Sequence, residues 1–220
     1  MEQLTTQKAA FLDVITERRS VRHYDPSVKI SRDEITEMLK EATLAPSSSN
    51  LQPWRFLVID DQELKEKLLP IAFNQQQVVT ASAVIAILGD YEGYKAAETI
   101  YNKAVNAGYM NEEVKSSLIQ NINSRYSNRE REVIKQIALV DGGLVAMQFM
   151  LVAKARGYDT VPMGGYNTAK FKEVFNISDR YETIMLIALG KAAQPGHPTV
   201  RLDVEDITFW NEMPVPVTGK

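Results

Sequence analysis

The chain contains no cysteine among its 220 residues. Disulfide bonds, thiolate metal sites and catalysis by a thiol nucleophile are therefore excluded. Histidine is scarce as well, because His23 and His197 are the only two. Neither has an aligned acid or serine that would make it the base of a catalytic triad, and neither belongs to a metal-ligand spacing. We therefore expect no metal site and no side-chain nucleophile.

An excess of positive charge is also missing, because 25 lysines and arginines stand against 28 aspartates and glutamates, for a formal net charge of -3. This balance argues against a nucleic-acid partner. A local basic patch can still bind a single anionic group. We therefore expect a small-molecule ligand rather than nucleic acid.

Long uninterrupted hydrophobic runs are missing too. The N-terminus has no basic region followed by an apolar stretch, so we expect no signal peptide. The most apolar long segment, 137–153, is interrupted by Asp141, Gly142, Gly143 and Gln148. A membrane span needs roughly 20 mostly apolar residues, so this segment is predicted to be a buried helix. We expect a cytoplasmic protein without a membrane partner.

The periodicity of apolar residues predicts interleaved helices and strands. A chain of this length suits one well-buried domain, so residues 1–220 are predicted to form a single domain. Helices are predicted over residues 8–18, 32–44, 61–69, 74–79, 130–156 and 169–175. Strands are predicted over residues 56–59, 83–88 and 183–189, with a short strand or extended segment over 159–162. Interleaving of this kind predicts a sheet covered by helices on both faces.

Local signals predict several boundaries. Ser31 is a good N-cap, and Glu34 completes a capping box three residues later. Gly157 ends the long helix as a C′ residue. Residues 91–131 are polar, with apolar positions spaced for one-sided burial, which predicts a peripheral helical excursion. The proline-rich segment 191–220 predicts an extended arm that packs on a partner chain, and a frayed terminus is the alternative.

Positive charge gathers around a hydroxyl near the N-terminus, in Arg18, Arg19, Ser20 and Arg22. Guanidinium groups bind phosphate in a bidentate manner, and the serine hydroxyl adds a neutral donor. On a helix, positions 18 and 22 share one face while 19 points away, so the donors converge if the helix ends near Arg19. A solvated helix end, where cations meet the macrodipole, explains the same charges.

Amide side chains form the second group of candidate site residues. Asn50 and Gln52, in the loop 46–53, each offer a donor and an acceptor, as the edge of a heterocycle requires. Asn74 and Gln77 are three residues apart and would face the same way on a helical turn. A surface turn explains the loop equally well, and amides on a helical turn usually face solvent.

The segment Pro162-Met163-Gly164-Gly165 is a third candidate. Adjacent glycines let a backbone approach a ligand closely and donate from its amides, although a simple turn uses the same residues. Arg201 adds a cation in an extended part of the arm, where a solvated arginine is the alternative. The chain has no Walker phosphate loop and no G-x-G-x-x-G, so we expect no dinucleotide bound in the Rossmann manner.

The order of these motifs resembles the FMN-dependent nitroreductase family. R-R-S-x-R stands at 18–22, P-S-S-x-N-x-Q-P-W at 46–54, and F-N-x-x-Q at 73–77. An apolar helix with D-G-G, then P-x-G-G, and finally a basic residue in the tail complete the series. The resemblance spans most of the chain, and its first two motifs are specific in combination.

The resemblance implies an α+β fold, a three-layer α/β/α arrangement with a mostly antiparallel central sheet and a C-terminal arm exchanged in a dimer. It also implies a homodimer with two FMN sites at the subunit interface. Carried over by position, the residues near the phosphate and ribityl chain are Arg18, Arg19, Ser20 and Arg201. Near the flavin ring, the resemblance places Arg22 at N1 and the C2 oxygen, and Asn74 and Gln77 at the pyrimidine edge. The other subunit contributes Pro46, Ser47, Ser48, Asn50 and Gln52. The flavin N5 and O4 lie near Pro162, Met163, Gly164 and Gly165.

The implied activity is an NAD(P)H oxidoreductase that reduces nitroaromatic, quinone or related acceptors. We expect a ping-pong cycle in which hydride from NADH or NADPH passes through flavin N5, with Arg22 stabilising the negative charge of the reduced flavin. Gln77 stands where some members carry lysine, and Gly164 replaces a glutamate of some members, so substrate range and reduction potential stay open. Ene reduction, dehalogenation, flavin breakdown and non-catalytic FMN binding are the alternatives.

Overall fold

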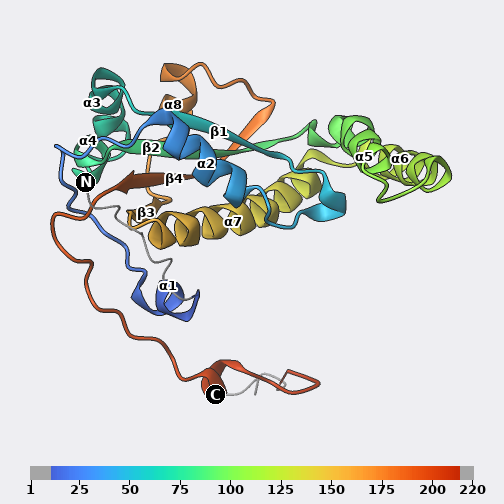
Figure 1. Ribbon diagram of the computed structural model, residues 1–220. Helices are drawn as coiled ribbons and strands as arrows, with labels where there is room; N and C mark the ends of the chain where they lie inside the picture. Colours follow the sequence, from blue (N-terminus) through green and yellow to red (C-terminus); the bar gives the residue numbers. More distant parts are fainter. Residues whose placement is uncertain (1–10, 214–220) are drawn as a thin grey trace, which may run out of the picture.

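The computed structural model describes residues 11–213, and one four-stranded sheet forms the centre of that part of the chain. Its strands are β1 (Trp54–Ile59), β2 (Ala83–Asp90), β3 (Asp159–Met163) and β4 (Tyr181–Gly190). They lie in the order β1-β2-β4-β3, and every neighbouring pair is antiparallel (Figure 1). The predicted antiparallel sheet is therefore confirmed.

The central strand β2 is buried along its whole length and packs on both faces. Because successive side chains of a strand point to opposite faces, Val84, Ala86 and Leu88 enter one core while Ile85 and Ile87 enter another. The first core is covered by α3 (Gln62–Ile71), α4 (Gln77–Thr80) and α8 (Thr168–Val174). The second is covered by α2 (Arg32–Ala42) and α7 (Arg131–Ala155). The predicted three layers are confirmed.

Helix α7 is long and apolar enough to cross a membrane by length and composition alone, a test that the core helix of a soluble protein also passes. Here Val145 and Phe149 of α7 are fully buried in the core beneath the sheet. Gly142 lets the helix approach the sheet closely, because a Cβ there would lie 2.2 Å from Cδ1 of Ile184. Ile184 stands at an irregularity where the pairing of β2 with β4 shifts by one residue.

The capping signals act as predicted at two helix ends. Ser31 accepts a hydrogen bond from the backbone N of Glu34 at 3.1 Å, and Gly157 adopts a φ of +80° directly after α7 and its C-cap. The predicted return bond of the capping box is replaced, because the Glu34 carboxylate accepts from Nη1 of Arg156 at 3.0 Å. This ion pair fastens the start of α2 to the end of α7.

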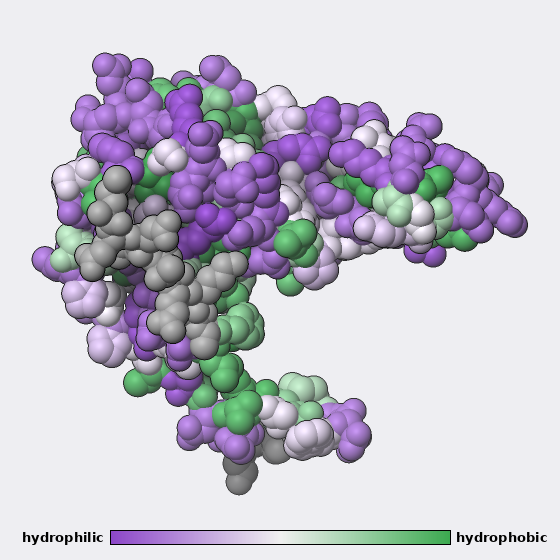
Figure 2. All heavy atoms as spheres, viewed as in Figure 1, coloured by the Kyte–Doolittle hydropathy of each residue, from purple (hydrophilic) through white to green (hydrophobic). Residues whose placement is uncertain are grey.

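Two segments extend from this body (Figure 1). Short helix η2 (Gly93–Ala96), α5 (Ala97–Asn106) and α6 (Glu112–Tyr126) project on one side and share a small apolar cluster with Leu51. After β4 the chain continues as an arm that leaves the body and contains η3 (Val204–Ile207). Figure 2 shows apolar residues on this arm and on the lower side of the body, whereas the upper side is mostly hydrophilic.

Candidate functional site

The cationic segment 18–22 runs along the outer edge of β3. Helix α1 (Phe11–Glu17) ends before it, and the predicted helical residues 8–10 lie outside the described part of the chain. Ser20 forms a parallel bridge with Thr160, and the N–H of Val21 donates to the Thr160 carbonyl at 3.1 Å. Of the two geometries considered, a helix that continues to Arg22 is excluded, and a helix that ends near Arg19 is the one found, because α1 ends at Glu17 and the chain then pairs with the edge of β3.

The three arginines of this segment differ in their partners. Arg19 donates from Nη1 to the carbonyl oxygens of Thr16 at 2.6 Å and Arg18 at 2.9 Å, so its cation caps the end of α1. Within residues 11–213, neither Arg18 nor Arg22 forms an ion pair with a carboxylate. Two guanidinium groups therefore remain available to an anionic ligand.

Amide side chains join the segment after α3 to the segment after β3. The buried Gln77 donates from Nε2 to Oε1 of Gln75 at 3.0 Å and to Sδ of Met163 at 3.3 Å. Gln75 donates from Nε2 to the carbonyl oxygen of Gly165 at 2.8 Å. Gln75 was not among the residues predicted from the sequence, although it stands within a run of four consecutive amide side chains, 74–77. The structure thus brings residues 74–77 and 162–165 together.

The helical turn predicted over 74–79 begins later than expected. Phe73 and Asn74 have left-handed φ values of 55° and 59°, and α4 starts only at Gln77. Asn74 and Gln77 therefore do not share one helix face, which corrects the prediction. Instead, the left-handed pair Phe73 and Asn74 forms the turn between α3 and α4, and α4 leads into β2.

Gly164 and Gly165 lie on an open surface. A Cβ at either position would meet nothing within 4 Å, and both residues are exposed. Packing inside the protomer therefore does not require glycine at these two positions. Backbone groups there are accessible to a ligand, next to the amides of 75 and 77.

The loop 46–52 lies away from these segments in the same chain. It contains the short helix η1 (Ser48–Asn50), drawn in light blue below the projecting helices, whereas α4 lies at the opposite end of the sheet (Figure 1). Asp141 of α7 anchors the loop by accepting from the backbone N of Ser48 at 3.1 Å. Arg201 is exposed on the arm, with Nη1 donating to the Val200 carbonyl at 2.7 Å. One protomer therefore gathers three of the five predicted segments.

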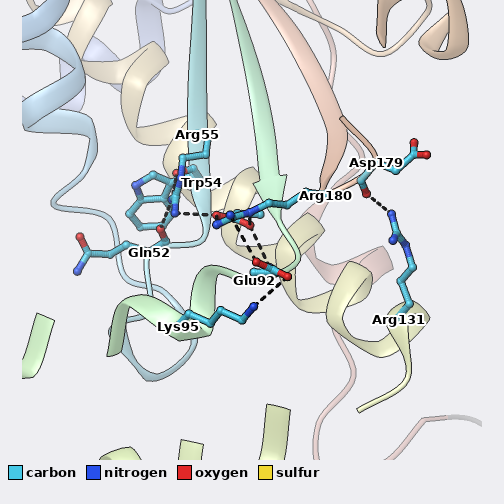
Figure 3. A network of polar contacts seen from close by, with 9 residues as sticks. Gln52, Trp54, Arg55, Glu92, Lys95, Arg131, Asp179 and Arg180 are labelled. Carbon is cyan, nitrogen blue, oxygen red and sulfur yellow. Dashed lines mark hydrogen bonds and ion pairs between the residues drawn. The ribbon is translucent and has the colours of Figure 1, made fainter. Parts of the chain in front are cut away.

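A network of charged groups borders the loop on its other side (Figure 3). Arg180 donates to the Asp90 carboxylate from Nε at 2.7 Å and from Nη2 at 2.8 Å. Arg55 donates to the same carboxylate from Nη2 at 2.8 Å and to the Gln52 carbonyl from Nη1 at 3.2 Å. Burial alone would raise the pKa of Asp90, but the hydrogen bonds and charges of the arginines hold the pKa below its ordinary value.

The donor set suits a ligand with an anionic end and a flat polar end. Guanidinium groups without an ion pair among residues 11–213, together with the Ser20 hydroxyl, are the donors that a phosphate requires, and amides offer the donors and acceptors that a heterocycle edge requires. The open backbone at 164–165 leaves space for a planar group to approach.

Comparison with known proteins gives the family. Residues 15–191 match the model of the Nitroreductase family. A Bacillus subtilis protein named as an NAD(P)H nitroreductase, YdgI, is 50% identical over 202 residues, which cover 91% of this chain and 97% of that protein. A protein from Lactiplantibacillus plantarum named CLA biosynthesis enone reductase is 38% identical over 199 residues, 89% of this chain and 92% of that protein.

A solved structure from Exiguobacterium sibiricum, described as a nitroreductase in complex with FMN, superposes with a TM-score of 0.89 at 50% identity. It covers 94% of this chain and 100% of that chain. The predicted α+β fold and the resemblance drawn from the sequence motifs are both confirmed, the exchange of the C-terminal arm stays a prediction, and the chain belongs to the Nitroreductase family.

Proposed function

We propose that the protein is a cytoplasmic, FMN-dependent NAD(P)H oxidoreductase that reduces nitroaromatic, quinone or related small acceptors. The observation that carries this proposal is the convergence of cations at 18–22, amides at 74–77 and open glycine backbone at 164–165. FMN fits these groups, because its phosphate needs cationic donors and its pyrimidine edge needs paired donors and acceptors. Membership of the Nitroreductase family supports the same cofactor.

Each segment has a separate task in this proposal. Arg18 and Ser20 hold the phosphate, and Arg19 joins them after releasing the carbonyl of Thr16. Asn74 and Gln77 meet the pyrimidine edge. When bound, FMN supplies hydride transfer at N5 between the reduced nicotinamide and the acceptor.

Arg22 is proposed to support the reduced state of the cofactor. Its side chain is exposed beside the other cations and makes no ion pair within the described residues. A charge-assisted hydrogen bond to an anionic oxygen stabilises by about 1.5–3 kcal/mol. Arg22 therefore affects the reduction step more than cofactor retention, which the other donors provide.

We further propose a homodimer in which the arm and the loop 46–52 complete the partner's site. Helix α7 exposes Val140 (64%), Leu144 and Met147, and the arm exposes Val200 (93%) and Trp210 (84%). Contiguous exposed apolar surface of this kind marks an interaction site. Because the loop lies at the opposite end of the sheet from α4 in its own chain, a second copy of the chain is the partner that brings the loop to the other segments.

The first experiment measures FMN binding and reduction directly. Purified protein is titrated with FMN, and the bound flavin is then reduced with NADH and with NADPH under nitrogen in a stopped-flow instrument. Arg22→Ala should slow flavin reduction about tenfold to a hundredfold while FMN affinity changes little. Arg32→Ala, a change of the same charge on the outer side of α2, is the matched control. Unchanged reduction in Arg22→Ala removes the role of Arg22, and absence of FMN binding by the unaltered protein removes the proposed function.

Ene reduction is the second candidate, favoured by the 38% identity to the L. plantarum enone reductase. The two activities differ in the acceptor and not in the cofactor. Turnover of an α,β-unsaturated ketone and of a nitroarene by the same FMN-loaded preparation separates them, because the better acceptor gives the higher kcat/KM.

A further inference from the structure

The loop 47–52 is held in a conformation that its residues disfavour. Ser49, Asn50 and Gln52 have φ values of 51°, 52° and 48°. Left-handed backbone is unfavourable for residues with a Cβ, although asparagine tolerates it best. Among residues 11–213, the segments 49–52 and 73–74 contain five of the seven non-glycine residues with positive φ. Backbone strain of this kind persists only where surrounding structure enforces it, and it gathers at functional sites.

Asp141 is the central anchor of this loop. Its side chain is only 1% exposed, and its carboxylate accepts from the backbone N of Ser48 at 3.1 Å and from the Ser48 hydroxyl at 3.2 Å. Within the described residues it has no cationic partner. Burial raises the pKa of Asp141, and the two hydrogen bonds from Ser48 oppose that rise. A buried carboxylate without a counter-ion opposes folding, so its presence requires another explanation.

Three further hydrogen bonds hold the loop, one within it and two from other elements. Tyr101 of the projecting helices donates its hydroxyl to the carbonyl of Ser49 at 2.8 Å. The Ser47 hydroxyl accepts from the N–H of Gln52 at 3.0 Å. Arg55 of β1 donates to the carbonyl of Gln52, as Figure 3 shows. Helix α7, the excursion and the sheet thus converge on a loop of six residues, of which only Leu51 is buried.

We propose that Asp141 is a positioning residue that, with Tyr101, preforms the loop 47–52 for contact with the flavin bound by the partner subunit. This inference rests on the proposed function, because it takes the loop to be part of an FMN site. The strained backbone holds Asn50 and Gln52 in one conformation, in which Nε2 of Gln52 donates to Oδ1 of Asn50 at 3.2 Å, so the ligand does not have to order them. Preorganisation of this kind raises affinity by lowering the ordering cost of binding.

The test compares three variants of the full-length protein. Asp141→Ala removes both acceptors, Asp141→Asn keeps one carbonyl oxygen for the Ser48 N–H, and Tyr101→Phe removes only the hydroxyl bond. Val145→Ala is the matched control, because Val145 lies one turn further along α7, is fully buried and packs in the core beneath the sheet. Hydrogen exchange of the 48–52 amides without ligand and the FMN dissociation constant are measured for each.

Asp141→Ala should weaken FMN binding about tenfold and speed exchange at Ser48 and Gln52, and Asp141→Asn should restore most of both. Tyr101→Phe should weaken FMN binding about threefold. Val145→Ala should lower overall stability with unchanged FMN affinity and unchanged loop exchange. The proposal is overturned if Asp141→Ala leaves FMN affinity unchanged, or if Val145→Ala weakens it as much. If Asp141→Ala does not fold, Tyr101→Phe decides, because unchanged FMN affinity in that variant overturns the proposal. Failure of the unaltered protein to bind FMN would instead refute the proposed function.

Discussion

Replacing Asp90 with asparagine tests how burial controls the strength of an ion pair in this fold. The Asp90 side chain is fully buried and accepts from Arg180 in a bidentate manner, from Arg55, and from the backbone N of Glu92 at 3.0 Å. Asp60 offers a matched control, because it accepts from Arg32 at 2.7 Å and 3.0 Å with the same bidentate geometry. Arg32 is 81% exposed, so this second pair lies in water.

The expected magnitudes follow from the two environments. Breaking a fully buried pair costs about 3–5 kcal/mol. The side chains of Arg55 and Arg180 are 40% and 43% exposed, and Nη1 of Arg180 lies 3.4 Å from Oε2 of Glu92. Water and Glu92 can therefore solvate the two arginines when the Asp90 carboxylate is removed. We therefore expect Asp90→Asn to lower the free energy of unfolding by about 2–3 kcal/mol. Asp60→Asn should lower it by less than about 1 kcal/mol, as exposed pairs do.

The pH dependence gives a second reading of the same interaction. Because the pKa of Asp90 is lowered in the folded protein from its ordinary value of 3.8, its contribution is complete above that pH and is lost as the pH falls through the folded pKa. Urea unfolding at fixed protein and FMN concentrations from pH 7 down to pH 3 measures this. The difference in free energy of unfolding between the unaltered protein and Asp90→Asn should become smaller as the pH falls. The reasoning is refuted if Asp90→Asn and Asp60→Asn lose equal free energy of unfolding at neutral pH. It is also refuted if the difference between the unaltered protein and Asp90→Asn grows as the pH falls.

Two further predictions concern the packing and capping of helices. Gly142→Ala should lower the free energy of unfolding by about 1–2 kcal/mol, because overpacking against Ile184 outweighs the better helix propensity of alanine. Ile184→Val removes the Cδ1 atom that the new Cβ would meet, so the double variant should lose less free energy of unfolding than the sum of the two single losses. Additive losses in urea unfolding would show that the contact with Ile184 is not the cause. Ser31→Ala removes the N-cap of α2 and should cost about 1 kcal/mol, measured the same way with Ser27→Ala, outside the helix, as the control.

Much of the fold follows from local sequence signals. The apolar runs 83–88 and 183–189 predict buried strands, and the structure places both at the centre of the sheet. Ser31 and Gly157 mark helix ends correctly, because caps depend on side chains and φ values within one turn. The motif order pointed to the family because it records spacing along the chain, which needs no knowledge of contacts.

Site residues that act through distant contacts were not predicted. In the sequence Asp141 stood as an interruption of an apolar helix and as the start of its D-G-G motif, with no role assigned, and its bond to Ser48 joins residues 93 positions apart. Gln75 and Tyr101 likewise gain their roles from carbonyl oxygens that lie 90 and 52 positions away. The helical turn predicted for Asn74 was wrong, because its left-handed φ depends on how the chain re-enters the sheet.

The sequence by itself determined the apolar periodicity, the caps and the set of cationic and amide groups offered to a ligand, because these depend on residue types and on neighbours within a few positions. Only the tertiary structure decided which of those groups meet. It set the segment 18–22 against β3, joined the amides of 75 and 77 to 163–165, and left the loop 46–52 at another end of the sheet. The physical reason is that strand pairing and helix packing bring distant segments together, and no local propensity encodes that distance.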